Sequence, residues 1–183
     1  MSDKLGSRKN VLSAEFLSPL YRISGEVTIR EQPLADLLND KMSNFIQAEK
    51  VYVSPIGDPT VFRAQHGDGM LRKDQISLVI LQREEDGYAR HTLYRNLGNV
   101  PIAYMLFAIL PGFEVRGGLK ISARSEVDNM LLQSVDRFIT IYHATVTLTA
   151  RPEFQFSGNA ILLNREHAQL FFLERALERM DKP

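Results

Sequence analysis

Apolar and polar residues alternate in two nine-residue stretches that can be laid over each other, YRISGEVTI (residues 21–29) and FEVRGGLKI (residues 113–121). The matching apolar positions are Tyr21, Ile23, Val27 and Ile29 in the first stretch and Phe113, Val115, Leu119 and Ile121 in the second. A period of two predicts a strand with one buried face and one wet face. Gly25 lies over Gly117, which indicates a bend, a bulge or a close crossing at the same place in both strands.

Each of these strands is followed by apolar residues at helical spacing. They are Leu34, Leu37 and Leu38 in PLADLLND, and Val127, Met130 and Leu131 in SEVDNMLL. Pro33 suits the first position of a helix, and Ser125 with Asp128 resembles a capping box. We therefore expect one short helix in each stretch, covering an open end of a small β unit.

Two further pairs of segments align in the same order. FIQAEKVYV (45–53) matches FITIYHATV (138–146), and the closing segment MLRKDQISLVIL (70–81) matches LLNREHAQLFFL (162–173). Agreement of local patterns in one order predicts an internal duplication. The expected fold class is mainly β with short helices, made of two tandem units at 11–82 and 101–174. Each unit is expected to be a small β-barrel or a strongly bent sheet.

The remaining segments are expected to be irregular or helical. SPIGDPT and RAQHGDG (54–60 and 63–69) carry the Pro and Gly of turns, with TVFRAQ as a strand between them. Residues 83–100 are interpreted as an exposed connector with a hairpin turn at Asp86 and Gly87. Residues 175–183 are expected to form a short helical tail.

The segment VPIAYMLFAIL (100–110) is apolar on both faces, which is typical of a strand covered on both sides. Either the two units pack against each other there, which we favour, or a partner or second subunit covers it. The candidate interface residues are Val100, Ile102, Tyr104 and Leu106.

The chain has 183 residues, and its 22 Lys and Arg balance 22 Asp and Glu. No overall field therefore attracts nucleic acid or an anionic membrane. It has no Cys, which excludes disulfides and thiolate chemistry and fits a reducing compartment. The N-terminal residues are polar, and the longest apolar run is about half as long as a spanning helix. We expect a cytoplasmic protein that does not enter a membrane.

Two resemblances follow from these motifs. The strand with a central Gly, then Asp40, Met42, Asn44 and Phe45, then the closing segment from Leu71 to Ile80, resembles the two signature segments of Sm-like (LSm-type) barrels, including their bacterial RNA-chaperone branch. The pattern R-x-x-G-x-V, L-x-D-L-L-N and F-I is similar to that of bacterial proteins of unknown function. Its positions are Arg22, Gly25, Val27, Leu34, Asp36, Leu37, Leu38, Asn39 and Phe45. The first resemblance implies two Sm-like or SH3-like barrels. The chain departs from it in the helical insert and in residues 72–75, Arg-Lys-Asp-Gln, which stand where Sm-like proteins tend to have a basic residue with Gly or His.

Motifs for catalysis or cofactors are not recognisable in the sequence. The four histidines, His66, His91, His143 and His167, lack ligand spacing on a common element. GDG at 67–69 is not a phosphate loop, and no G-x-S-x-G nucleophile elbow occurs. We expect no catalytic residues, no metal site, no cofactor and no enzymatic activity.

Charged residues recur just before the last strand of each unit, and they are the candidate ligand-binding residues: Arg72, Lys73, Asp74, Arg165, Glu166 and His167. They could present cations to an anionic ligand. Alternatively, acid and base could stabilise a turn, which we favour. The aromatic residues Tyr21, Phe45, Phe113, Phe138, Phe171 and Phe172 could stack on bases, but their spacing favours a hydrophobic core.

The resulting expectation is a non-catalytic binding or scaffolding protein that associates with a protein partner or with itself, since open strand edges invite pairing. RNA or nucleotide binding through the basic turns is the alternative. A small enzyme with a cleft between the units is a third hypothesis.

Overall fold

The computed structural model describes residues 10–29, 32–89, 102–121 and 135–175. Its first part contains β1 (Asn10–Leu17), β2 (Tyr21–Ile29), α1 (Leu34–Asn39), β3 (Phe45–Pro55), β4 (Ala64–Arg72), the 3-10 helix η1 (Lys73–Gln75), β5 (Leu78–Leu81) and the 3-10 helix η2 (Glu84–Gly87). Its second part contains β6 (Ile102–Leu110), β7 (Phe113–Ile121), β8 (Phe138–Leu148), β9 (Arg151–Asn164), the 3-10 helix η3 (Arg165–His167) and β10 (Leu170–Arg175). Within these ranges no helix is long and apolar enough to cross a bilayer.

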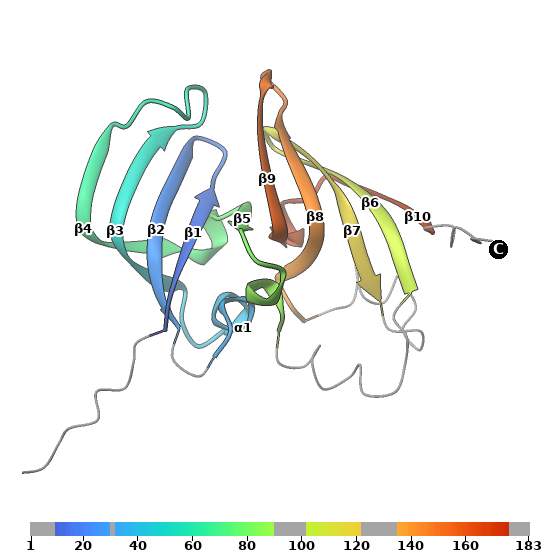
Figure 1. Ribbon diagram of the computed structural model, residues 1–183, viewed down its shortest axis with the longest axis horizontal. Coiled ribbons are helices and arrows are strands. Elements are labelled where there is room, and N and C mark those ends of the chain that lie inside the picture. The colour runs from blue at the N-terminus through green and yellow to red at the C-terminus, as the bar shows by residue number, and fades with distance from the viewer. Residues whose placement is uncertain (1–9, 30–31, 90–101, 122–134, 176–183) are drawn as a thin grey trace, which may run out of the picture.

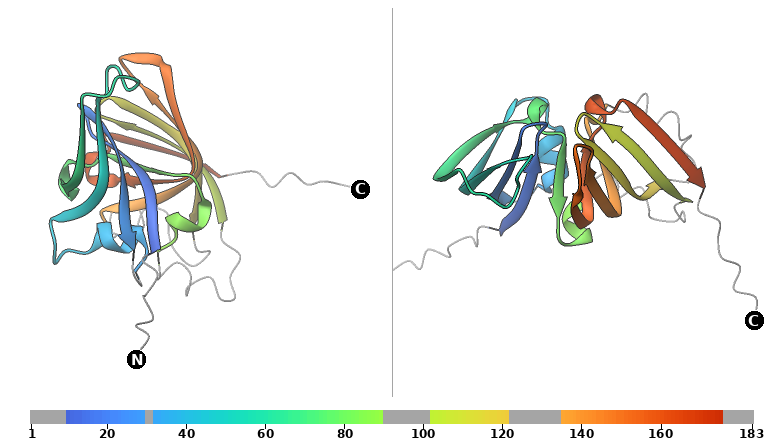
Figure 2. Two further views of the ribbon diagram at one scale, coloured as in Figure 1. Left: turned by 60° about the vertical axis from the view of Figure 1, so that its left-hand side comes forward. Right: turned by 90° about the horizontal axis from the view of Figure 1, so that it is seen from above.

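All ten strands form one antiparallel sheet in the order β10-β6-β7-β8-β9-β5-β1-β2-β3-β4. The mainly β fold class is confirmed. The sheet does not close into a barrel, because the outer edge of β5 is taken by β9 and not by a strand of its own half. We call β1–β5 the N-terminal half and β6–β10 the C-terminal half. Each half is a bent group of five strands, and the two groups meet along β5 and β9 (Figure 1; Figure 2, right).

The alternating patterns at 21–29 and 113–121 both form strands with those bounds, as predicted. In β7 the alternation in burial is complete from Phe113 to Ile121. Three of the six aromatic residues were assigned to the core wrongly, and one of them, Phe172, is 57% exposed on the end strand β10. Tyr21 is 47% exposed because it begins its strand beside a turn, and Phe45 is 43% exposed beside the outermost strand β4.

The glycine at the centre of each pattern lies at a bulge, where the register of pairing shifts. A Cβ on Gly117 would lie 2.6 Å from the Cβ and 2.9 Å from the Cα of Ala144. A Cβ on Gly25 would lie 3.3 Å from the Cβ of Ala48. Close approach of the neighbouring strand therefore explains the glycine at 117, and more weakly at 25.

Helix α1 begins after Pro33 and buries Leu34, Ala35 and Leu38 in the core of the N-terminal half, as its apolar spacing predicts. Pro33 is the residue before the helix and not its first residue. Asn39, at the helix end, donates from Nδ2 to the carbonyl of Phe138 (3.0 Å) and accepts from its amide (2.7 Å). The short helix therefore also ties the two halves together.

The closing segment 70–81 is not a single strand. It contains the end of β4, the turn η1 and then β5, and the segment 162–173 is divided in the same way by η3. Residues 64–69, read as a turn because of Gly67 and Gly69, belong to strand β4. The interpretation failed because β4 lies at the end of the sheet, where most of its side chains are exposed and an apolar alternation is not required.

Strand β5 is buried on both faces. Leu78 and Ile80 belong to the core of the C-terminal half, whereas Val79 and Leu81 belong to the core of the N-terminal half. Its partner β9 divides in the same way, with Ile161 and Leu163 on one side and Ala160 and Leu162 on the other. We call this pairing the seam. The predicted internal interface at 100–110 is therefore wrong in position, since β5 and β9 join the halves.

The first part of the connector packs against the sheet, although the side chains of Arg83 and Glu85 are exposed. Residues 84–87 form η2 instead of a hairpin, and Gly87 lies so close to β9 that a Cβ would be 2.5 Å from that of Ala160. Ala89 is only 6% exposed. The second predicted helix (125–132) and the helical tail (176–183) lie outside the described residues, while Arg175 ends β10.

The two bulge glycines give a paired test of packing. We expect Gly117→Ala to lower the free energy of unfolding by about 1–3 kcal/mol, because backbone as well as side-chain atoms of Ala144 would have to move. Gly25→Ala should cost clearly less. Urea denaturation of both variants measures the difference, and an equal effect would contradict the tighter crossing at Gly117.

Candidate functional site

The six residues predicted as ligand-binding lie on or beside η1 and η3, and the structure brings the two turns together at one end of the seam. His167 contacts the Asp74 carbonyl through Nε2 (2.8 Å) and Ser77 Oγ through Nδ1 (3.0 Å). Asn164 is fully buried. Its backbone N–H donates to the carbonyl of Ser77, and its side-chain Nδ2 donates to the carbonyl of Ile76, each at 2.9 Å. We call the hydrogen bonds of Asn164 and His167 to residues 74–77 the polar lock, and they lie at the end of the seam.

Lys73 does not face solvent. Its residue is 3% exposed, and Nζ donates to the carbonyls of Leu37 and Asp40 at the end of α1, the latter at 3.0 Å. Burial lowers the pKa of Lys73 from its ordinary value, while the nearby Asp40 raises it. The ammonium group serves as a cap for helix carbonyls and is not available to a phosphate.

The other predicted cations are also engaged within the protein. Arg72 donates from Nε to Asp74 (3.0 Å), and this hydrogen bond lowers the pKa of the Asp74 carboxyl. Arg165 donates from Nε to the carbonyl of Asp136 (2.5 Å), and Glu166 pairs with Arg137 at 2.9 Å. Each turn thus carries an ion pair, but not between the residues that the favoured interpretation named: Asp74 pairs with Arg72 and not with Lys73, and Glu166 pairs with Arg137 and not with Arg165.

Of the candidate interface residues, Leu106 is buried in the core of the C-terminal half, and Ile102 and Tyr104 are half-buried on β6. Val100 lies outside the described residues. Strand β6 pairs with β7 and β10 and so is not a sheet edge.

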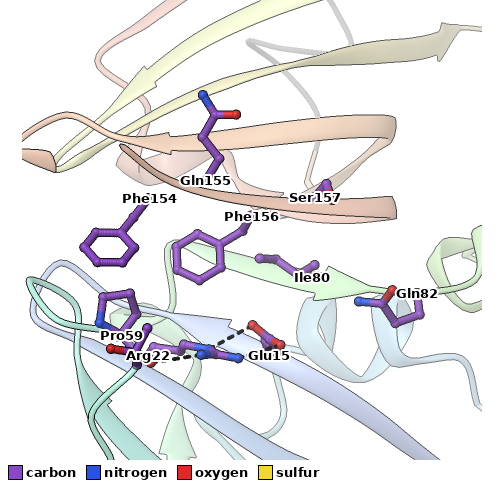
Figure 3. A pocket seen from close by; sticks show the side chains of 10 residues that line it. Glu15, Arg22, Pro59, Ile80, Gln82, Phe154, Gln155, Phe156 and Ser157 are labelled. Atoms are coloured by element: carbon purple, nitrogen blue, oxygen red, sulfur yellow. Dashed lines mark hydrogen bonds and ion pairs between the residues drawn. The ribbon is translucent and has the colours of Figure 1, made fainter. Parts of the chain in front are cut away.

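A groove that the sequence did not reveal crosses the seam, with a volume of about 300 Å³. Phe154 and Phe156 of β9 line one wall, while Glu15 of β1 and Arg22 of β2 form the other (Figure 3). Arg22 was part of the recognised R-x-x-G-x-V pattern. The alternating Phe154 and Phe156 carried a weak signal, but only the fold places them opposite Arg22.

The charges of the groove cancel within it. Arg22 donates to Glu15 from Nε (3.0 Å) and Nη2 (2.9 Å), and from Nη1 to the Pro59 carbonyl (2.9 Å). Its Cζ also lies 5.7 Å from the ring centre of Phe156. Arg22 thus joins β1, β2 and the loop before β4 to the aromatic wall of β9. The groove presents aromatic and amide groups to a ligand, with its guanidinium already paired.

Comparisons with known proteins add no identity. No protein-family model, no curated protein and no solved structure matches the chain.

A cluster of titratable groups lies on the outer side of η2. Glu84 accepts from Lys120 Nζ (2.6 Å) and the Tyr88 hydroxyl (2.9 Å), and His143 Nε2 lies 3.3 Å from its other oxygen. The hydrogen bonds from Lys120 and Tyr88 lower the pKa of Glu84. Burial raises the pKa of Tyr142, over whose ring Lys120 Nζ lies at 4.4 Å. The cluster fastens η2 onto β7 and β8.

In the ranges that the structure describes, no three His, Asp or Glu side chains lie close enough together to hold a metal ion. The groove and the polar lock lie on the seam, and each is built from both halves. The candidate functional feature of this protein is therefore the seam, with the binding surfaces that strand pairing creates.

Substituting the buried lysine tests its structural role. We expect Lys73→Met to lower the free energy of unfolding by about 1–3 kcal/mol, because two buried carbonyls lose their donor. Arg72→Gln, at the neighbouring exposed ion pair, is the control and should have little effect. Thermal and urea denaturation measure both. A stable Lys73→Met protein would reopen the possibility that Lys73 contacts a ligand.

Glu84 gives a prediction for pH. The pKa of Glu84 in the folded protein is lowered below the ordinary value of 4.5. Its contribution to the free energy of unfolding is therefore complete above pH 4.5 and is lost as the pH falls through the pKa of the folded state. Glu84→Gln should therefore be less stable than the wild type at pH 7, with a difference that shrinks by pH 3. Urea denaturation at both pH values measures this, with the exposed Glu85→Gln as control. A difference independent of pH would contradict it.

Proposed function

We propose that the chain is a non-catalytic binding or scaffolding protein built from two homologous Sm-like halves, residues 11–82 and 101–174. The first support is the order of strands. In the N-terminal half it is β5-β1-β2-β3-β4, and in the C-terminal half it is β10-β6-β7-β8-β9, with the strands in the same sequence along the chain.

The registers of pairing agree as well. Phe16 pairs with Val79 in the N-terminal half, and Ala108 pairs with Phe171 in the C-terminal half. Both residues of the second pair lie 92 positions after their counterparts. The pairing of β6 with β7 follows that of β1 with β2 at the same interval.

The irregular features of the backbone also correspond. Register shifts occur between Ser24 and Glu26 in one half and between Arg116 and Gly118 in the other. In the ranges that the structure describes, two non-glycine residues have positive φ angles, Lys50 (50°) and His143 (47°), at equivalent places in β3 and β8. Left-handed backbone is unfavourable for such residues. Its occurrence twice at one position favours descent from one ancestral unit.

The observation that carries the function is the seam. An edge strand of one half, β5, binds an edge strand of the other, β9, through main-chain hydrogen bonds and two apolar faces. Each half is thus a module that binds by adding a strand, a common mode of protein recognition. A scaffold that binds partner proteins through its free sheet edges uses the same main-chain hydrogen bonds and apolar contacts between molecules.

RNA or nucleotide binding through the basic turns is less well supported. Lys73 is buried against carbonyls, Arg72 is paired with Asp74, and Arg165 donates to the backbone. Anisotropy titration with a single-stranded RNA at low salt, where phosphate contacts are strongest, should give no saturable binding. Binding abolished by Arg72→Gln and Arg165→Gln together would favour the RNA alternative instead.

The scaffolding proposal predicts where partners attach. Cross-linking of the chain in its native cell, followed by mass spectrometry of the linked peptides, should give links to other protein molecules concentrated on β4 and β10. Cross-links found only within single chains, or spread evenly over the surface, would contradict the proposal. Because β4 and β10 contain no lysine, the cross-linker must be photoreactive and not lysine-specific, and exposed residues away from both strands, such as Arg116 and Lys120 of β7, supply the internal reference.

A further inference from the structure

The sheet ends in two strands that have a partner on one side only among the described residues. Strand β4 pairs with β3, and β10 pairs with β6. The two strands lie at opposite ends of the molecule (Figure 1), so they cannot pair with each other within one chain. Each therefore offers a row of main-chain donors and acceptors to a second molecule.

These two ends are the positional counterparts of the two strands that form the seam. Strand β10 holds the place of β5 in its half, and β4 holds the place of β9. The seam shows that strands of these two kinds bind each other. A free strand of each kind, on one chain, makes the chain complementary to a copy of itself.

The apolar residues at the free edges are exposed where their counterparts in the seam are buried. Leu170 and Phe172 of β10 are 40% and 57% exposed, and their counterparts Leu78 and Ile80 are 0% and 2% exposed. Met70 of β4 is 63% exposed, and its counterpart Leu162 is fully buried. Exposed large apolar side chains in a row on a sheet edge indicate a surface that becomes covered.

We infer that the chain associates head to tail with further copies, β10 of one copy pairing antiparallel with β4 of the next. The inference rests on the proposed strand-adding function and names its partner. In the seam Leu78, Val79 and Ile80 pair with Leu163, Leu162 and Ile161. The same register between copies pairs Leu170 with Leu71, Phe171 with Met70, and Phe172 with Gly69.

The side chains suit this register. Phe172 lies opposite Gly69, which has no side chain and leaves room for the ring. Phe171 and Met70 form an apolar pair, and sulfur–aromatic contacts are favourable. The next pair would oppose Leu173 and Asp68, where the seam has Leu81 and Ala160. The pairing between copies therefore ends one residue earlier.

Other features agree with pairing between copies. Arg72 of β4 holds the place that Asn164 has in β9. In the seam, the Asn164 side chain donates to the carbonyl of Ile76. Between copies, the Arg72 guanidinium can donate to the carbonyl of Ala168, which holds the place of Ile76. The chain has no net charge, so copies do not repel each other at long range. A head-to-tail contact uses one free edge and leaves another, so it continues until a ring closes or a filament grows.

Two variants block one edge each. Phe172→Asp places a carboxylate on β10, and Met70→Asp places one on β4. Met42→Asp is the control, because Met42 is 94% exposed and lies in the loop after α1, away from both edges. Circular dichroism verifies that each variant is folded, and multi-angle light scattering over about 1–100 μM, a range that spans moderate affinities, gives the mass.

The wild type and Met42→Asp should exceed the monomer mass of 20.8 kDa. Each edge variant alone should remain a monomer. An equimolar mixture of the two should form a dimer and nothing larger, because the intact β4 of one meets the intact β10 of the other. The dimer also demonstrates that both variants are folded. A monomeric wild type overturns the inference, as do a mixture that stays monomeric and an edge variant that dimerises with itself.

The outcomes separate this inference from the proposed function. If the wild type is monomeric but cross-links on β4 and β10 lead to a different protein, the scaffold stands and self-association is wrong. If neither self-association nor such cross-links occur, the proposed function fails as well.

Discussion

The antiparallel pairing of β5 with β9 is the constraint on which the rest of the structure depends. Only four residues of β5 take part, and all are buried. Since consecutive side chains point to opposite faces, alternate residues complete the cores of the two halves. A shift of one residue in this pairing would move each side chain of β5 from one core to the other, so the register is strongly specified. Buried Asn164 fixes it further, because its side-chain Nδ2 donates to the carbonyl of Ile76 and its backbone N–H donates to the carbonyl of Ser77.

Much of the fold was predictable from the sequence where one face of a strand is wet. The strands at 21–29 and 113–121 could be recognised because apolar residues at every second position suit a half-buried strand and do not suit a helix. The order of elements followed from aligning the two parts of the chain. The seam could not be predicted, because LVIL at 78–81 is apolar on both faces whether its partner belongs to the same half, the other half or another molecule. Part of strand β4 was predicted to be a turn. Most side chains of this end strand are exposed, so its sequence does not need to alternate apolar and polar residues.

The charged turns illustrate a different limit. The recurrence of Lys73 with Asp74 and of Arg165 with Glu166 drew attention to two turns, and the structure places both at one end of the seam. The sequence could not say whether each side chain points inward. Lys73 does so because the end of α1 offers carbonyls to its ammonium group. The groove at Arg22 was beyond prediction, because its lining comes from segments more than a hundred residues apart.

The place of β5 in the chain has a consequence for how the protein is made. Its partner strand ends only at Asn164, more than eighty residues after Leu81. At a synthesis rate of about 5–20 residues per second, the apolar edge of β5 stays without its partner for roughly 4–17 seconds while the ribosome completes β9. During that interval the nascent N-terminal half exposes the surface that later becomes the centre of the molecule. Chaperones, or the corresponding strand of a neighbouring nascent chain, would compete for it before the chain can satisfy itself.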